Sequence, residues 1–182
     1  PSEARLRTLS DCGLRISVYP PFSYDASGGG APVGTVGDEG GEGGNEGGSE
    51  GEGEGGSKKS SLSFDPTAVS IPALDFRTTK FLGLPLPPGL RIEIEPLRLS
   101  GWIRRATGEV SLDFEAKFTF TAFGLYRPPS LSVSATLTTG EATGRSSGEG
   151  SGVRLCGRGE KLRENGRVAL SGVAVVEPVG DF

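Results

Sequence analysis

The chain has 182 residues, enough for one domain and an appendage, and its 19 basic and 23 acidic side chains give a formal net charge of −4. It contains no histidine, which removes the commonest general base and metal ligand, and two cysteines alone do not make a zinc site. The charge balance lacks the positive excess of a nucleic-acid-binding domain, and no apolar run approaches the length of a membrane span. We therefore expect no cofactor, no nucleic-acid partner and no direct membrane span.

Cys12 and Cys156 are the only cysteines, and they could form one disulfide or remain unpaired and buried, the unpaired state being favoured. The chain has no Met and begins with Pro1, which cannot be an initiator. We expect a processed or trimmed form that has lost a targeting segment.

The first 88 residues are expected to form three extended segments. Residues 1–27 are an arm with a candidate edge strand, in which Leu14, Ile16 and Val18 alternate with polar residues until Pro20 and Pro21 end it. This strand is free to pair with another protein's sheet. Residues 28–61, mostly glycine and glutamate, are expected to be a flexible tether. Residues 62–88 combine frequent proline with apolar residues, which predicts an extended arm lying on the chain's own sheet or on a partner.

Residues 89–182 are predicted to form an all-β domain, a single antiparallel meander of about five strands. Its central strand covers 110–122, where seven apolar residues alternate with six polar ones, the period of a half-buried strand. A strand before it, from Leu90 to Ile103, should contain a bulge or bend at Pro96, and residues 106–108 form the turn between the two.

The third strand is predicted over 131–138, followed by a Gly/Ser-rich loop over 139–152. A weak strand near Val153 to Leu162 and a returning strand over 168–176 complete the meander. Asn165-Gly166 between them predicts a type I′ hairpin turn, in which both residues have positive φ.

Catalytic candidates are few. Asp113 and Glu115 lie on the polar side of the central strand, about 7 Å apart by strand geometry, a separation that could serve a glycosidase. Alternating charge on a solvated face is the ordinary explanation for these residues, and Lys117 continues the series, so the chain is not expected to be an enzyme. A partner surface is the stronger candidate, because Trp, Tyr and Arg are enriched at interface anchors. The expected partner-contact residues are Trp102, Arg104, Arg105, Tyr126, Arg127, Phe81 and Leu84.

Three motifs, LYRPP at 125–129, LTTG at 137–140 and GVAVV at 172–176, lie in a block from Leu90 to Pro178. The block resembles a family of small plastid-targeted β-sheet proteins of algae and plants, and most nearly the peripheral stromal β-sheet subunits of red-lineage algal photosystem I. The resemblance implies a non-catalytic accessory subunit in the chloroplast, peripheral on the stromal side of the thylakoid membrane, which stabilises contacts between the photosystem I core and its antenna.

Two other functions compete with this one. A lipid or small-hydrophobe carrier would use Val110, Leu112, Phe114, Phe118 and Phe120 as the lining of a cavity, although five strands are few for a closed barrel. A hydrolase would use Asp113 or Glu115.

Overall fold

The structure is a computed structural model, which describes residues 2–15, 20–38, 58–145 and 154–178. It is all-β and antiparallel, as predicted, but it has three sheets and more than five strands instead of a single meander. The largest sheet has seven strands, which lie in the order β1 (Ser2–Arg7), β4 (Gly30–Asp38), β5 (Ser60–Phe64), β8 (Leu90–Arg104), β9 (Glu109–Ala122), β10 (Leu131–Thr138) and β13 (Val175–Pro178). A single 3₁₀ turn, η1 (Pro66–Ala68), follows β5.

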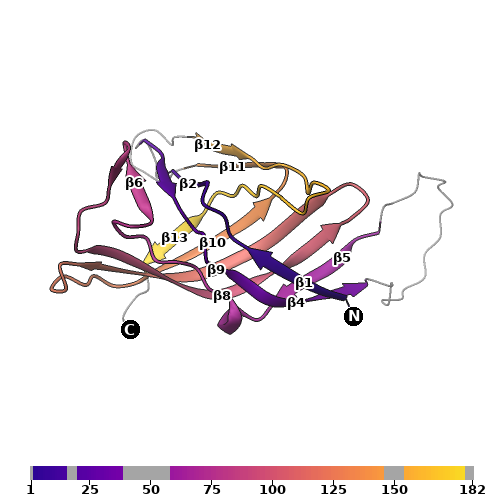
Figure 1. Cartoon of the computed structure of the whole chain (residues 1–182), viewed down its shortest axis with the longest axis horizontal. Coiled ribbons are helices and arrows are strands. Elements are labelled where there is room, and N and C mark those ends of the chain that lie inside the picture. Colours follow the sequence, from indigo (N-terminus) through magenta and orange to yellow (C-terminus); the bar gives the residue numbers. More distant parts are fainter. Residues whose placement is uncertain (1, 16–19, 39–57, 146–153, 179–182) are drawn as a thin grey trace.

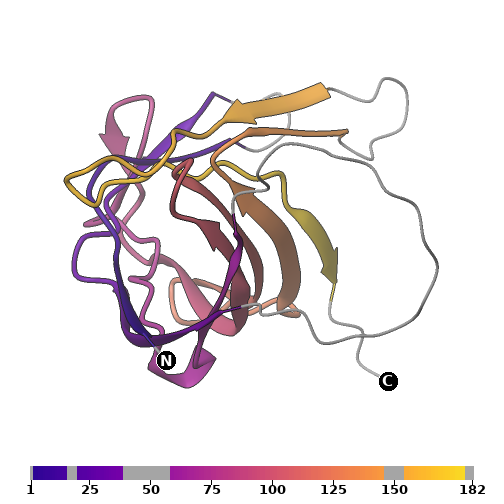
Figure 2. The ribbon, with the colours of Figure 1, turned by 90° about the vertical axis from the view of Figure 1, so that its right-hand side faces the viewer.

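The seven-stranded sheet curves into a trough, and the two smaller sheets lie over its concave side (Figure 1, Figure 2). The four-stranded sheet contains β2 (Cys12–Leu14), β3 (Phe22–Tyr24), β6 (Thr79–Phe81) and β7 (Leu84–Pro85). The third sheet is a ribbon of β11 (Glu141–Arg145) and β12 (Arg154–Arg158).

The long hairpin of β8 and β9 forms the middle of the molecule, and here the sequence predictions are confirmed. The two strands pair from Leu90↔Ala122 to Arg104↔Glu109, and their register shifts between Pro96 and Arg98, where the proline predicts a bulge. The third predicted strand is β10, which pairs with β9 along its whole length.

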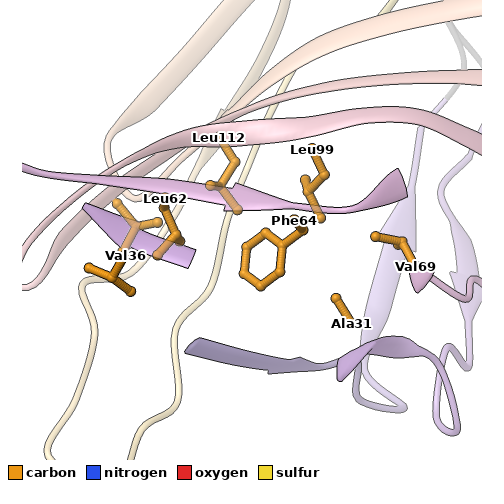
Figure 3. Packing of buried hydrophobic residues seen from close by; sticks show 8 residues of the cluster. Ala31, Val36, Leu62, Phe64, Val69, Leu99 and Leu112 are labelled. Atoms are coloured by element: carbon orange, nitrogen blue, oxygen red, sulfur yellow. The ribbon is translucent and has the colours of Figure 1, made fainter. Parts of the chain in front are cut away.

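The core lies between this hairpin and the strands that precede it. Leu112 of β9 and Leu99 of β8 pack with Leu62 and Phe64 of β5 and with Val36 of β4. Figure 3 shows the Phe64 ring between Leu99 and Ala31. Burying side chains of this size contributes about 1.5–3 kcal/mol each. A second cluster places Tyr24 and Leu74 over Ile92 and Ile94, and so attaches the four-stranded sheet to β8.

The expected tether over 28–61 needs correction, because residues 30–38 are β4 and residues 60–64 are β5. Ala31 and Val36 are buried, and glycine at 34 leaves room for the Phe64 ring, since a Cβ there would lie 2.4 Å from a ring carbon. The low average hydropathy of the glycine-rich stretch hides a strand that buries only small residues. Residues 39–57 of the expected tether lie outside the described part.

The N-terminal arm also differs from expectation, whereas the Pro-rich arm takes the first of the two positions expected for it. Residues 2–7 form an edge strand of the large sheet, and β2, the start of the candidate edge strand, pairs with β3 of its own chain. Residues 16–19 of that candidate lie outside the described residues. The Pro-rich arm lies on the chain's own sheet, where Phe64, Val69 and Leu74 are buried.

The C-terminal part departs from the predicted meander in three places. Residues 141–145, expected in a loop, are β11, whose Ala142 is buried. The returning strand over 168–176 is reduced to bridges at Ala169 and Ser171, and the ladder with β10 begins at Val175. The Asn165-Gly166 turn forms with positive φ at Gly166 alone, and Arg163 N–H donates to the carbonyl of Arg167 at 2.8 Å. It is therefore a three-residue hairpin loop and not a type I′ turn.

Candidate docking surface

The long hairpin separates the predicted partner-contact residues into two groups. Trp102, Arg104 and Arg105 lie beside the turn that joins β8 to β9, whereas Tyr126 and Arg127 follow β9 at the opposite end. A strand of fourteen residues spans about 45 Å. The two groups cannot form one compact interface.

The end that carries Trp102 is bound up in contacts within the chain. The Lys59 ammonium lies 4.4 Å from the centre of the Trp102 ring and the Arg104 guanidinium 5.5 Å from it. Arg104 also donates to the Glu109 carboxylate at 2.5 Å, and the Thr107 hydroxyl donates to the same carboxylate at 2.9 Å. These hydrogen bonds, that of Thr107 first, lower the pKa of Glu109. The Trp102 ring and the Arg104 guanidinium are therefore already in contact with groups of the same chain.

The opposite end exposes large apolar side chains on two turns. One turn joins β6 to β7 and the other follows β9, and β6 lies at the left-hand end of the molecule, where β8 begins (Figure 1). The exposed fractions are 69% for Leu82, 70% for Leu84, 67% for Phe123, 94% for Leu125 and 63% for Tyr126. We call these five residues the apolar end.

The backbone at both turns is unusual. Leu82 has a φ of 52° and Phe123 a φ of 53°, the only positive values among the described non-glycine residues, and each is followed by a glycine with positive φ. Bulky residues rarely adopt this conformation, which costs about 1–2 kcal/mol and usually belongs to Gly, Asn or Asp. The same pattern, a large apolar residue, glycine and leucine, occurs at 82–84 and 123–125. The fold therefore accepts strain at both turns and displays an apolar side chain at each.

The turn after β9 is held firmly to the segment that precedes β8. Phe123 N–H donates to the Gly89 carbonyl at 2.7 Å, and its ring lies so close to Gly89 that a Cβ there would meet it at 2.7 Å. Tyr126 and Ala122 exchange both backbone hydrogen bonds, at 2.9 and 3.0 Å. The exposed side chains thus project from a fixed backbone.

Positive charge accompanies the apolar side chains. Residues 79–89 and 121–130 contain Lys80 and Arg127 and no acidic residue. Within the described residues neither cation takes part in a salt bridge, and Asp75 and Glu93, on the adjoining segments, are both paired with Arg91. The apolar end therefore has a local charge opposite in sign to that of the whole chain.

The predicted residues Phe81 and Leu84 differ in their availability. Phe81 pairs with Phe22 of β3, and their ring centres are 4.6 Å apart, so Phe81 belongs to the four-stranded sheet. Leu84 is exposed and belongs to the apolar end. The sequence reading missed Leu82, Phe123 and Leu125, which the repeated pattern of a large apolar residue before Gly-Leu could have identified.

Asp113 and Glu115 line a broad open hollow of about 610 Å³. Its other lining residues come from β9 and β10, from Arg98 of β8 and from the segments at 141–143 and 173–175. Asp113 accepts a hydrogen bond from the Thr136 hydroxyl at 2.9 Å, and Glu115 lies 3.7 Å from Arg98. Both carboxylates are solvent-exposed and have ordinary surface partners. The hollow contains the charged groups Arg98 and Glu141 as well, so it does not resemble an apolar ligand cavity.

The residues proposed to line a lipid cavity are instead divided between core and sheet surface. Val110 and Leu112 are buried against side chains of β4, β5 and β8, and Phe114 packs against the same cluster. Phe118 and Phe120 are half-buried. The described residues form no cluster of three or more metal-ligating side chains, and none of the helices among them is long and apolar enough to cross a membrane.

Both cysteines are free, and Cys156 is exposed instead of buried. Burial first, and then the nearby charge of Asp11, raises the pKa of the Cys12 thiol, which disfavours the reactive thiolate. Burial likewise raises the pKa of Tyr24 to about 12, and its hydroxyl donates to the carbonyl of Pro72. The environment of Cys12 is therefore not that of an activated nucleophile.

The comparisons with known proteins add no relative: no family model, no curated protein and no solved structure matches the chain.

Proposed function

We propose that this protein is a non-catalytic accessory protein that attaches through its apolar end to the periphery of a membrane-bound assembly. The observation that carries the proposal is the display of five large apolar side chains, 63–94% exposed, on two turns at one end of the molecule. Scattered exposed apolar residues are normal, but a group of them on a rigid frame indicates an interaction site.

The backbone strengthens this interpretation. Asparagine or glycine at 82 would relieve the left-handed strain with little loss of contact, because Leu82 is largely exposed, yet the chain has leucine there. At 123 the chain has phenylalanine, whose ring packs on Gly89 but stays mostly exposed. Strained positions of this kind cluster at functional sites. The free energy lost in each turn is repaid when the side chain is buried by a partner, since burying a leucine or phenylalanine contributes about 1.5–3 kcal/mol.

The assembly that we propose is photosystem I with its antenna, because the resemblance of residues 90–178 is to peripheral subunits of that complex. In this setting the chain would lie in the plastid, at the stromal side of the thylakoid, and stabilise contacts between subunits. The alternative carrier function has no comparable support, because Val110 and Leu112 fill the core that a ligand would need.

Co-migration tests the proposal. Thylakoid membranes are depleted of the endogenous protein, incubated with purified chain, solubilised gently and separated on a native gel. We expect the wild-type chain to migrate with photosystem I and the L82N/L125N variant to remain free. The matched control is L97N, because Leu97 is also an exposed leucine, 50% accessible, but lies at the bulge of β8 away from the apolar end. Equal recovery of all three proteins with the complex would show that the apolar end is not the attachment surface.

A further inference from the structure

We propose that the apolar end binds lipid directly: the turns at 82–84 and 123–126 insert into the interface of a bilayer that contains anionic lipids. The inference rests on the proposed function and narrows it: the apolar end attaches the chain to the assembly through the lipid that surrounds it, so co-migration after gentle solubilisation requires that this lipid stays bound. Three properties of the two turns lead to it: their shape, their charge and their backbone.

The shape suits a bilayer better than a protein surface. The apolar side chains project from the tips of two separate turns, with Leu125 94% exposed, and do not form one flat face. A protein partner would need two pockets at matching positions, whereas the fluid interface of a bilayer accepts projections at any spacing. Tyr126 is suited to the boundary, where an aromatic ring can be buried while its hydroxyl stays in water.

The charge is complementary to an anionic surface. Lys80 and Arg127 flank the two turns, have no salt bridge within the described residues and have no acidic neighbour in residues 79–89 or 121–130. The whole chain has a net charge of −4, so an anionic surface repels it unless the chain approaches with a positively charged part first. Local cations at the apolar end would orient it with the turns toward the lipid.

The backbone lowers the cost of insertion. Pro85, Pro87 and Pro88 follow the first turn, and Pro128 and Pro129 follow the second. Proline has no backbone N–H, so these segments carry fewer donors that would lose water in the interface. The hydrogen bonds between Phe123 and Gly89 and between Ala122 and Tyr126 satisfy further backbone groups within the chain.

Vesicle flotation with the purified full-length chain tests the inference. The wild-type chain should float with phosphatidylcholine vesicles that contain phosphatidylglycerol, and much less with phosphatidylcholine alone. Each of the two substitutions in L82N/L125N removes one apolar side chain from the bilayer and should lower the affinity for vesicles about tenfold. K80Q/R127Q should lose about fivefold for each cation and with it most of the dependence on anionic lipid and on salt. The control L97N should float like the wild type.

A tryptophan probe reports where the chain enters. Trp102 is the only tryptophan and lies at the opposite end of the long hairpin, so wild-type emission should not be quenched by brominated lipids. Emission from W102F/L125W should shift to the blue and be quenched. If W102F does not fold, L125W alone serves, with Trp102 as a constant background.

The outcomes separate this inference from the proposed function. The inference is wrong if the wild-type chain binds neither kind of vesicle. It is also wrong if the L82N/L125N variant binds the vesicles as well as the wild-type chain does. If vesicle binding fails while co-migration with photosystem I still requires Leu82 and Leu125, the attachment surface stands and its partner is a protein. Quenching of Trp102 in the wild-type chain would place the opposite end at the membrane and would overturn the assigned orientation.

Discussion

The two ends of the long hairpin solve the same problem, reversal of the chain, in opposite ways. At the turn between β8 and β9, Gly108 takes the positive φ, 72°, and polar side chains close around the turn through Arg104, Thr107 and Glu109. At the other end Phe123, with a φ of 53°, precedes Gly124 with 69°, and the neighbouring apolar side chains face solvent. The polar side chains at the turn between β8 and β9 have partners within the chain, whereas the large apolar side chains at the other end face solvent.

The difference shows that the apolar end is not a general property of this sheet. The same two strands that end in a well-paired polar turn also lead to exposed leucine, phenylalanine and tyrosine. A turn needs neither strain nor exposed apolar groups, as the first end demonstrates. The strain and the exposed side chains of the apolar end are therefore the features that the proposed binding partner would explain.

The largest effect is expected where both ends depend on the same packing. Leu112, 1% exposed, lies in the middle of β9 among core residues. We expect L112A to lower the free energy of unfolding by about 3–5 kcal/mol, because it removes buried methyl groups and leaves a cavity. Urea unfolding measures this, with L97A as the control at a half-exposed position. A loss below that of L97A would show that the core does not hold the hairpin.

Glycine-to-alanine changes at the two turns compare the ends directly. A Cβ at Gly108 would lie 2.8 Å from the carbonyl oxygen of Leu162, while a Cβ at Gly124 would meet nothing within 4 Å. Both glycines have a similar positive φ, so both variants incur the backbone cost and only G108A adds a clash. We expect losses of about 2–3 kcal/mol for G108A and about 1 kcal/mol for G124A in urea unfolding. Equal losses would mean that the two turns are equally open.

Relief of the strain should stabilise the free protein. L82N places a residue that tolerates the left-handed region at a position with φ of 52° and removes no buried contact of consequence, so we expect a gain of about 1 kcal/mol. The control is L84N, which changes an exposed leucine in the same hairpin at an ordinary φ and should stay within about 0.5 kcal/mol of the wild type. Loss of stability in L82N would show that Leu82 packs within the chain. Together with lost attachment, a gain would demonstrate that stability is given up for binding at this turn.

Sequence patterns revealed the hairpin well and its surroundings poorly, for identifiable reasons. The alternation over 110–122 defines β9 because one of its faces is buried and the other is wet. In β4 the buried residues are Ala31, Gly34 and Val36, too small to raise the apolar signal above that of the glycine-rich tract that follows. Its strand character depends on Phe64, more than 25 residues later, and composition cannot report that contact.

The docking residues show the same limit. Residue type alone selected Trp102 and Tyr126 as one set of anchors, since both are aromatic and neighbour arginine. Which aromatic group is free depends on its partners in space: Lys59 and Arg104 lie against Trp102, and Phe22 against Phe81. The Gly-Leu pattern after Leu82 and Phe123 is visible in the sequence, but only the backbone φ values show that both residues lie in the left-handed region.

The smallest effect is expected at the polar end, by which we mean the turn between β8 and β9 with Arg104, Thr107 and Glu109. This effect should depend on pH. The hydroxyl of Thr107 and the guanidinium of Arg104 lower the pKa of Glu109 from its ordinary value of 4.5, so its ionised form stabilises the folded chain above that pH. This contribution is lost as the pH falls through the lowered pKa of the folded state. E109Q should therefore melt slightly below the wild type at neutral pH, and the two melting temperatures should converge in acid. Because the Glu109 side chain is partly exposed to solvent, which screens its interactions, the difference should be small. L125N, whose substitution removes no titratable group, should differ from the wild type by the same amount at every pH. A difference for E109Q that persists unchanged into acid would mean that the polar end owes its order to something other than this charge, and the contrast between the two ends would then lie in shape alone.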